Sequence, residues 1–490
     1  MFQFRASERF MSIFKPKTKF SSHENPNYSI NTNNIIKSQP AVRIIALFLI
    51  IASIQALLNV FRIGYSYSSF GFHHPQLRSS PPKSFPVENH HHDCKHGKVY
   101  MYELPPKFNK LHLENCYDLD PWKSLCPAVS NGGFGPKAIN LDGVVPKNLT
   151  PAWYWTDMYI SEVIYHARMV NYGCRTLKPE EATAFYVPFY AGLAIAKYFF
   201  YNYSSRARDR LPEMLLEWIK EQPFWKRRNG SDHFMVFGRL IWAFRQMTNE
   251  STDWGTRFFN MPLMQNVSKI TVCRDLKDEL DISVPYPTAF HPRSRSDIEE
   301  WQRFIRSRTR RSLFSFVGAT RKKIKNDFRA LLVDYCVSET NACKFVDCSA
   351  KKCSDGEPAI LEAFLDSRFC LQPRGDGATR RSFFDCMMAG SIPVYFWEDS
   401  FKGQFEWHLP SEAESYSVFI DYKDVKKNGT DCIRRKLEEF SEEKIRKMRE
   451  TIIDFLPRIL YAQSSLGDLQ DAFDITIESV MRKFQKELRD

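Results

Sequence analysis

The sequence lacks the features that mark several large classes of protein. Its 69 Lys+Arg and 57 Asp+Glu are mixed along 490 residues rather than gathered in a basic tract, and it shows no zinc-finger spacing and no internal repeat. The glycine patterns G-x-G-x-x-G and G-x-x-x-x-G-K-[ST] are also missing. These absences argue against nucleic-acid partners and leave NAD and P-loop sites without support. With 43% apolar residues the chain is globular in composition.

Long hydrophobic runs are absent with one exception, residues 44–61 (IIALFLIIASIQALLNVF). The run carries no charge and is close to the short limit for a membrane span. Basic residues outnumber acidic ones before it, and only Arg62 follows it before Arg78. The positive-inside rule therefore predicts a cytosolic tail over 1–43, a single transmembrane signal anchor over 44–61 and a lumenal remainder, which is a type II arrangement. The alternative is a cleaved signal peptide, against which the long preceding segment argues. A short span favours the Golgi membrane.

The part after the span carries the marks of the secretory pathway. All twelve cysteines lie there, an even number in a compartment that permits disulfides. Four of them crowd one polar loop with spacings that do not match a zinc ribbon, so we expect disulfides; they are Cys336, Cys343, Cys348 and Cys353. Residues 62–97, rich in Ser, Pro and His, are predicted to form a flexible stem. Sequons for N-glycosylation occur at Asn148, Asn202, Asn229, Asn249, Asn266 and Asn428.

Short β-rich runs alternate with amphipathic stretches beyond the stem. This alternation is typical of α/β domains with largely parallel sheets, and we place one domain at 98–300 and a second at 301–490. Strands are expected at 98–103, 184–188, 233–237, 268–272, 313–317, 368–371 and 392–396, and helices at 153–170, 211–220, 296–311, 326–334, 380–389, 441–456 and 468–488.

The stretch 364–396 carries the clearest chemical signal. A strand leads into the turn Pro373-Arg-Gly-Asp-Gly377, and Thr379 is expected to cap the helix that follows. A helix N-terminus attracts anions, and arginine presents forked donors to phosphate oxygens. Arg374, Arg380 and Arg381 supply three such side chains, and Asp385 would accept hydrogen bonds from ribose hydroxyls. A solvated surface helix is the alternative.

A nucleoside diphosphate site in a lumenal, membrane-anchored protein indicates a glycosyltransferase with a nucleotide-sugar donor. Fixed arginines and a helix N-terminus stabilise a departing diphosphate without a metal, so we expect no cofactor and no metal. A metal-dependent transferase would instead need a D-x-D pair. One match exists, Asp118-Leu-Asp120, in a Cys/Pro-rich loop. A metal-dependent transferase that uses this pair is therefore one alternative.

With these residues in hand, the chain resembles the plant exostosin family of glycosyltransferases, in its xyloglucan galactosyltransferase branch. The resemblance runs from about Lys98 to the C-terminus and rests on stretches such as KVYMYELPPKFN, NGGFGP, VPYPTAFHP, LFSFVGATR and FCLQPRGDGATRRSFFDCMMAGSIPVYF. It implies a GT-B fold, with two Rossmann-like domains facing a cleft and terminal helices that return to the first domain. It also implies a UDP-sugar donor, inversion at the anomeric carbon, Golgi residence and a xylosyl side chain of a cell-wall glucan as acceptor.

Galactose from UDP-galactose is the donor that the resemblance favours, with xyloglucan, the Golgi membrane and other glycosyltransferases as partners. UDP-galacturonic acid or a pentose nucleotide is the enzymatic alternative. A non-catalytic lumenal subunit that binds glycans or acts as a scaffold is the alternative from another class.

The resemblance further implies which residues surround the UDP. They are Arg321, Arg374, Gly375, Asp376, Thr379, Arg380, Arg381, Ser382 and Asp385. Related sequences often have glutamine at the position of Arg374. Its charge would either favour an acidic donor sugar or pair with Asp376.

An inverting transfer needs a group that takes the proton of the acceptor hydroxyl. The candidates are Glu162, His291 and the pair Asp232 and His233. Asp232 and His233 begin a strand, whereas sites in open α/β sheets form beyond the carboxyl ends of strands. A structural role is therefore expected for this pair, and Glu162 has capping of a neighbouring segment as its alternative.

Overall fold

The computed structural model describes residues 94–121, 123–198, 203–246, 255–320, 327–349, 353 and 357–487. The predicted tail and anchor, most of the predicted stem, and Arg321, Asn202 and Asn249 lie outside these residues. Within the described part of the chain, no helix is both long and apolar enough to cross a bilayer. The four described sequon asparagines, Asn148, Asn229, Asn266 and Asn428, are exposed, and their glycosylation stays a prediction.

Six parallel strands form the first sheet, in the order β2-β1-β3-β4-β5-β6. Strands β4 and β5 are buried along their whole length, as expected for a parallel sheet covered on both faces. The strands are β1 (Lys98–Met101), β2 (Arg175–Thr176), β3 (Ala182–Tyr186), β4 (His233–Phe237), β5 (Ser268–Thr271) and β6 (Asp281–Ser283).

The helices of this half are shorter than predicted at one important place. Helix α5 begins at Ser161, not at Trp153, so the prediction of a helix over 153–170 is wrong in its first half. Trp153 to Trp155 are irregular backbone, in which Tyr154 N–H donates to the carbonyl of Ala289 and Trp155 N–H to that of Pro136. The apolar periodicity there comes from side chains buried in a loop. The helices are α3 (Lys110–Glu114), α4 (Cys126–Val129), α5 (Ser161–Val170), α6 (Ala191–Ala196), α7 (Ser205–Ile219) and α8 (Pro223–Arg228).

Five parallel strands form the second sheet, in the order β11-β10-β9-β7-β8. The chain runs outward from β7 to β8 and then returns past β7 to β9, so the order reverses between β7 and β9. In doubly wound sheets, ligands bind in the crevice at such a reversal. The strands are β7 (Ser312–Gly318), β8 (Cys343–Asp347), β9 (Ser367–Gln372), β10 (Ile392–Tyr395) and β11 (Val418–Phe419). The prediction of two α/β domains with parallel sheets is confirmed.

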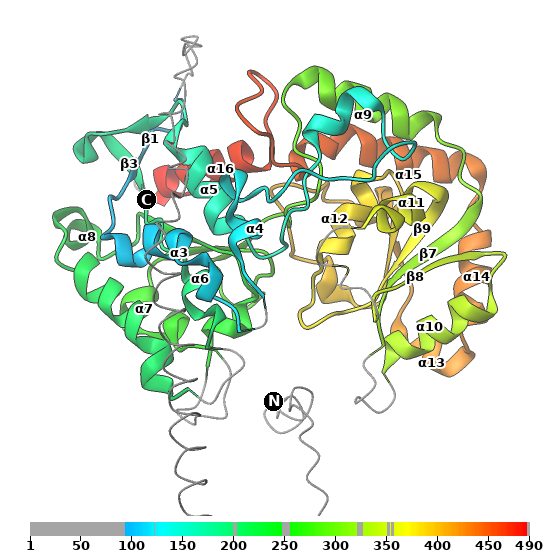
Figure 1. The fold of residues 1–490 in the computed structure, drawn as a ribbon, viewed down its shortest axis with the longest axis horizontal. Helices are drawn as coiled ribbons and strands as arrows, with labels where there is room; N and C mark the ends of the chain where they lie inside the picture. The colour runs from blue at the N-terminus through cyan, green and yellow to red at the C-terminus, as the bar shows by residue number, and fades with distance from the viewer. Residues whose placement is uncertain are drawn as a thin grey trace, which may run out of the picture. The chain divides into compact units, whose positions relative to one another are not determined.

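The helices that follow the first sheet include one that returns to it. Helix α16 places Phe473, Ile477 and Val480 in one apolar cluster with Tyr186 of β3 and Phe234 of β4, and Figure 1 shows it beside α5. The helices are α9 (Arg295–Ser307), α10 (Phe328–Ser338), α11 (Pro358–Asp366), α12 (Arg381–Met388), α13 (Tyr422–Asn428), α14 (Asp431–Glu438), α15 (Glu442–Phe455) and α16 (Ala472–Glu487).

Disulfides join most of the cysteines. Cys336 pairs with Cys343 and Cys348 with Cys353, which confirms the prediction of disulfides for this group. The polar loop predicted there is wrong, because Cys343–Asp347 forms β8. The other pairs are Cys94–Cys174, Cys116–Cys126 and Cys370–Cys386, while Cys273 and Cys432 are free.

Candidate active site

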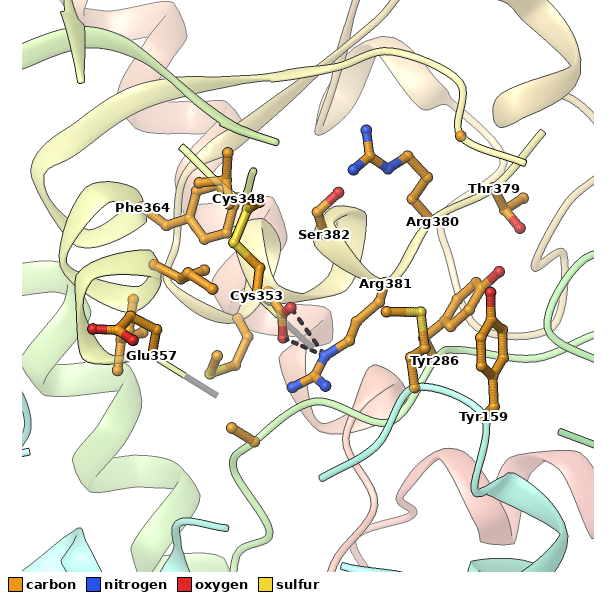
Figure 2. A pocket seen from close by; sticks show the side chains of 18 of the residues that line it. Tyr159, Tyr286, Cys348, Cys353, Glu357, Phe364, Thr379, Arg380, Arg381 and Ser382 are labelled. Atoms are coloured by element: carbon orange, nitrogen blue, oxygen red, sulfur yellow. Dashed lines mark hydrogen bonds and ion pairs between the residues drawn. A yellow bond between two sulfur atoms is a disulfide. The ribbon is translucent and has the colours of Figure 1, made fainter. Parts of the chain in front are cut away.

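A cavity of about 310 Å³ lies at the carboxyl ends of β7, β8 and β9, lined by residues of both halves of the molecule. The first half contributes Trp153, Trp155, Met158, Tyr159, Leu240, Tyr286 and Ala289. The second half contributes Val317, Arg329, Cys348, Cys353, Glu357, Ile360, Leu361, Phe364, Gly375, Asp376, Gly377, Thr379, Arg380, Arg381, Ser382, Asp385 and Met388 (Figure 2). The cavity therefore occupies the reversal point of the second sheet and faces the first.

The turn between β9 and α12 forms one wall of this cavity. Ser382 Oγ donates to Gln372 Oε1 at 2.6 Å, and Gln372 Nε2 donates to the Ser382 carbonyl at 3.2 Å. These two bonds fix the start of α12 to the end of β9. Gly377 lies so close to the first half that a Cβ there would approach Leu240 Cδ2 to 3.0 Å. The glycine therefore allows the turn to pack against the opposite half.

Thr379 does not cap α12 as predicted. The N-cap residue is Arg380, in extended backbone conformation, and α12 begins at Arg381. The hydroxyl of Thr379 donates instead to the carbonyl of Val272, at 2.9 Å, just beyond β5. The turn between β9 and α12 is called the donor turn below, because the sequence predicts the sugar donor there. Thr379 joins this turn to the first half, because its hydroxyl points away from the helix and towards that carbonyl. Gly390, two residues after the end of α12, has a left-handed φ of 68°.

Two arginines stand at the N-terminus of α12. Arg380 Nη1 donates to the carbonyl of Pro373, at 3.2 Å, and so folds back over the turn. Arg381 Nε donates to Asp385 Oδ2, at 3.1 Å, and Arg381 Nη1 donates to the carbonyl of Thr156 in the first half. Burial raises the pKa of Asp385, and the charge of Arg381 opposes that shift. Both arginines line the cavity at the N-terminus of α12, and a helix N-terminus with adjacent guanidinium groups favours a bound anion.

Arg374, also predicted at the donor site, lies elsewhere. Its Nε donates to Asp399 Oδ1 at 3.0 Å, within an ion pair of the two side chains. Its guanidinium lies 5.5 Å from the ring centre of Trp397. The partner is therefore Asp399 and not Asp376, and Arg374 does not belong to the residues that line the cavity.

The phenol of Tyr159, in the first half, interacts electrostatically with charged groups of both halves. Burial raises its pKa to about 12; the guanidinium of Arg239 lowers it, the carboxylate of Asp376 raises it and the guanidinium of Arg380 lowers it. Asp376 and Arg380 belong to the donor turn, whereas Tyr159 and Arg239 belong to the first half. The phenol therefore lies within electrostatic reach of a carboxylate and an arginine across the cavity.

Asp232 and His233 form a buried pair at the start of β4. His233 Nδ1 lies 2.7 Å from Asp232 Oδ1, and His233 Nε2 lies 2.9 Å from the hydroxyl of Tyr102. Arg227 Nη2 donates to Asp232 Oδ2 at 3.0 Å, and the His233 ring stacks on Phe185. Every polar atom of the imidazole is used, at the amino end of the strand. This placement supports the structural role that the sequence led us to expect.

His291 is buried one layer behind the cavity. Its Nδ1 lies 2.7 Å from the carbonyl of Tyr461 and its Nε2 lies 2.8 Å from Thr156 Oγ1. Burial lowers its pKa to about 3, and the charges of Arg381 and Lys137 act in the same direction. The imidazole is therefore neutral, and it supports Thr156, whose carbonyl receives Arg381.

Glu162 is a buried carboxylate on α5. Its Oε1 accepts the N–H of Gly192 at 2.6 Å and that of Gly238 at 3.0 Å, while its Oε2 has no hydrogen-bond partner among the described residues. Burial raises its pKa to about 7, against the effect of the two N–H groups and of Arg239. Glu162 thus connects the segments that follow β3 and β4. None of the four candidate bases is among the described residues that line the cavity.

The acidic pair predicted as the alternative metal site lies outside the cavity. Asp118 pairs with Lys197 at 3.0 Å and is largely exposed, and Asp120 Oδ1 accepts the N–H of Lys123 at 3.2 Å. Over the described ranges, no group of three or more His, Cys, Asp or Glu is placed to hold a metal ion.

Several cavity residues were missed in the sequence. Leu240 and Tyr286 each follow the end of a first-sheet strand, β4 and β6, by three residues, so the rule that sites form beyond carboxyl ends was the available signal. Tyr159 and Glu357 had no such signal, because the first lies in a segment expected to be helical and the second begins a helix that was not predicted.

Comparison with known proteins now places the chain. An exostosin GT47 domain matches residues 93–435, which is more than half of its length. Xyloglucan galactosyltransferase XLT2 of Arabidopsis thaliana is 50% identical over 396 residues, covering 80% of this chain and 76% of that protein. Xyloglucan-specific galacturonosyltransferase 1 of the same plant is 37% identical over 396 residues, covering 80% and 58%.

Among solved structures, a glycosyltransferase from Rickettsia africae ESF-5 is similar with a TM-score of 0.29 and 8% identity, over 58% of this chain and 82% of that one. A TM-score this low does not establish a shared fold. The family match and the identity to the plant enzymes are decisive without it. The chain belongs to the exostosin GT47 family of glycosyltransferases.

Proposed function

We propose that this glycosyltransferase has the GT-B fold and transfers galactose from UDP-galactose, with inversion, to the xylosyl side chains of xyloglucan. The observation that carries the proposal is the cavity between the halves, where Arg380 and Arg381 lie at the N-terminus of α12 opposite Tyr159 and Tyr286. A relative half identical to this chain and named a xyloglucan galactosyltransferase supports the acceptor and the donor.

The second half of the cavity suits the leaving group. Loss of UDP from the anomeric carbon develops negative charge on the β-phosphate. The side chains of Arg380 and Arg381 are held in place before the reaction by their hydrogen bonds to the carbonyls of Pro373 and Thr156, beside the first N–H groups of α12. Preorganised donors of this kind stabilise the departing diphosphate, and we expect the reaction to need no metal. Gly375 leaves the side of the turn next to Arg380 without a side chain, so the phosphates can approach the turn there.

The transferred sugar belongs between the phosphates and the first half. Asp376 is the exposed carboxylate of the donor turn, within electrostatic reach of Tyr159. We assign it to hydrogen bonds with hydroxyls of the transferred sugar. The acceptor then approaches from the side of Tyr159 and Leu240, and the four predicted bases stand behind this surface rather than on it.

The placement of Arg374 favours a neutral sugar. A galacturonic acid donor brings a carboxylate, and Arg374 was the cation expected to receive it. That guanidinium is already paired with Asp399, and Arg374 is not among the described residues that line the cavity. UDP-galacturonic acid and pentose nucleotides remain the enzymatic alternative, since one relative is named a galacturonosyltransferase.

The cellular setting follows from the sequence. We propose a type II Golgi membrane protein with a tail over 1–43, an anchor over 44–61, a stem over 62–97 and lumenal domains over 98–300 and 301–490. Its partners in this setting are the UDP-sugar, the xyloglucan acceptor and other glycosyltransferases of the same membrane.

A mass-shift assay tests the proposal. The purified full-length chain is incubated with a xyloglucan oligosaccharide and UDP-galactose, and we expect a product heavier by one hexose. A product with UDP-galacturonic acid but none with UDP-galactose would overturn the choice of donor. UDP binding without turnover on any donor would favour a non-catalytic subunit that retains the fold.

A further inference from the structure

We propose that a second cavity, of about 440 Å³, binds the xyloglucan polymer away from the site of transfer. The end of α15, the segment that leads to α16 and one face of α16 form most of it, and among the described residues none lines both this cavity and the active-site cavity. This inference rests on the proposed function, because it takes the acceptor polysaccharide as the ligand. It gives the returning C-terminal segment a role in binding.

An indole ring provides the aromatic surface of the second cavity. Trp407 packs against the apolar cluster of the first half and also lines the cavity. Its main-chain carbonyl accepts a hydrogen bond from Arg458 Nη2 at 2.8 Å, which fixes the backbone at this residue. Leu469 and Ile475 extend the apolar part of the wall. The C–H face of a pyranose ring can pack on such a surface, because the face is apolar whereas the edge of the ring carries the hydroxyls.

The charged groups that line the second cavity are of both signs. The excess of carboxylates over guanidinium groups disfavours a polyanion. Within the described ranges, no group of three or more His, Cys, Asp or Glu is placed to hold a metal ion. A neutral ligand with many hydroxyls fits this mixture, because each hydroxyl can both donate and accept a hydrogen bond. The polar residues of the wall include Arg458, Arg482, Asp454, Asp468, Glu478, Gln470 and His96.

Several of these side chains keep hydrogen-bonding capacity for a ligand. Asp468, Gln470 and Glu478 have no side-chain hydrogen bond or ion pair with any described residue. Arg482 Nη2 donates to Ser479 Oγ at 3.2 Å, which leaves other N–H groups of this guanidinium for a ligand. Glu478 and Arg482 are one turn apart on α16, so an acceptor and a donor lie next to each other on the face of the helix that lines the cavity.

A second site suits an acceptor that is a polymer. A polysaccharide presents the same repeating unit many times along one chain, so two sites of one enzyme can bind one polymer. Binding at the second site raises the local concentration of acceptor at the first, and the affinity rises without any change in the chemistry of transfer. A short oligosaccharide occupies one site at a time. We therefore expect the second cavity to affect binding of the polymer and not the turnover of a single repeat.

Affinity electrophoresis tests the second cavity without turnover. The detergent-solubilised full-length chain is run on native gels with increasing amounts of soluble xyloglucan polymer and without a sugar nucleotide. We expect the polymer to retard the wild type. In Trp407→Ala the dissociation constant derived from the retardation should rise at least about tenfold, because a buried indole contributes strongly to a binding surface.

Glu478→Ala provides a second variant that keeps the indole and its packing. Loss of a hydrogen bond to a charged group should raise the dissociation constant about tenfold. Glu487→Ala is the matched control, because Glu487 is an exposed carboxylate of the same helix and is not among the residues that line the cavity. Retardation equal to that of the wild type in both Trp407→Ala and Glu478→Ala overturns the second site.

Turnover of a short acceptor separates loss of the second site from loss of the fold. In both variants, kcat and KM for a xyloglucan oligosaccharide of one repeat should stay within about twofold of the wild-type values. A parallel loss of oligosaccharide turnover and of retardation in both variants would mean that these residues act through the fold of the catalytic unit, and it would overturn the inference.

The outcomes also separate this inference from the function on which it rests. A wild type that neither transfers a hexose to the oligosaccharide nor is retarded by the polymer contradicts the proposed function. A wild type that transfers galactose to the oligosaccharide but is not retarded by the polymer overturns the second site and leaves the proposed function standing.

Discussion

Arg381 donates a hydrogen bond to the main-chain carbonyl of Thr156, and the two residues belong to different halves of the molecule. The hydroxyl of Thr156 lies 2.8 Å from His291 Nε2, and His291 Nδ1 lies 2.7 Å from the carbonyl of Tyr461, which precedes α16. One series of contacts therefore joins the donor helix, the first half and the returning C-terminal segment. The same arginine lines the cavity, so this contact couples the position of the proposed phosphate-binding group to the packing of the two halves.

Replacement of Arg381 by lysine should separate the effect of the positive charge from the effect of the hydrogen-bond geometry. Lysine keeps the positive charge but cannot bond Asp385 and Thr156 simultaneously through a planar fork. We expect Arg381→Lys to lower kcat/KM for the donor about a hundredfold and Arg381→Ala to lower it further, in proteins that still fold. Initial rates and calorimetric UDP binding provide the measurement. Arg446→Ala, which removes an exposed surface ion pair with Glu443, is the control, and wild-type UDP affinity in both Arg381 variants would contradict the diphosphate assignment.

The buried imidazole of His291 predicts a pH dependence of stability. Burial lowers its pKa from 6.5 to about 3. Between pH 3 and pH 6.5 the imidazole is therefore protonated in the unfolded chain and neutral in the folded chain. The stability is complete above pH 6.5 and falls as the pH drops towards 3, by up to about 1.4 kcal/mol per pH unit from this group. Chemical unfolding at pH 7.5 and 5.5 measures it. His291→Gln should lose less stability over this interval than the wild type does; an equal loss would mean that the imidazole titrates normally.

Variants of Glu162 distinguish two roles of its carboxylate: proton acceptor in the reaction, or structural acceptor of main-chain N–H groups. Glutamine can accept the same two N–H groups, of Gly192 and Gly238, but it cannot take a proton from an acceptor. We expect Glu162→Gln to keep activity within about threefold, and Glu162→Ala to lose roughly 2–6 kcal/mol of stability because two buried donors lose their partner. Initial rates and unfolding curves check both variants. A loss of a thousandfold or more in a folded Glu162→Gln protein would instead make this carboxylate the base.

The sequence predicted the fold more completely than the site. Parallel strands with apolar interiors and turns rich in glycine are local signals, which is why β4, β7 and β9 appear within one or two residues of their predicted bounds. The donor turn was found for the same reason, since its arginines and glycines are adjacent in the chain. Contacts between the two halves are not indicated by any local pattern in the sequence. The bond from Thr379 to Val272, the pairing of Arg374 with Asp399 and the electrostatic interaction of Tyr159 with Asp376 join residues that only the tertiary structure brings together.

Transfer without a metal predicts that chelation has no effect. Asp118 is engaged by Lys197 and lies outside the cavity, and we propose that Arg380 and Arg381 neutralise the charge of the diphosphate. We expect initial rates with excess EDTA to equal those with Mn²⁺ or Mg²⁺, and Asp118→Asn to behave as the wild type. Rates that vanish with EDTA and return with Mn²⁺ would show that a metal shares in stabilising the leaving group.

Asp376 should affect the transferred sugar and not the nucleotide. Its carboxylate lies on the turn before Arg380 and interacts electrostatically with Tyr159, and we propose that the transferred sugar binds at this place. Asparagine keeps the size of the side chain and part of its hydrogen bonding, so Asp376→Asn should leave the affinity for UDP unchanged. Hydrogen bonds to a charged group are worth about 1.5–3 kcal/mol, which corresponds to a loss of about 10–150-fold in kcat/KM for UDP-galactose. Calorimetry with UDP and initial rates with the sugar nucleotide measure the two quantities separately. Equal losses in both would move Asp376 from the sugar to the diphosphate, and a loss in neither would leave Tyr159 and the residues beside it as the surface that selects the sugar.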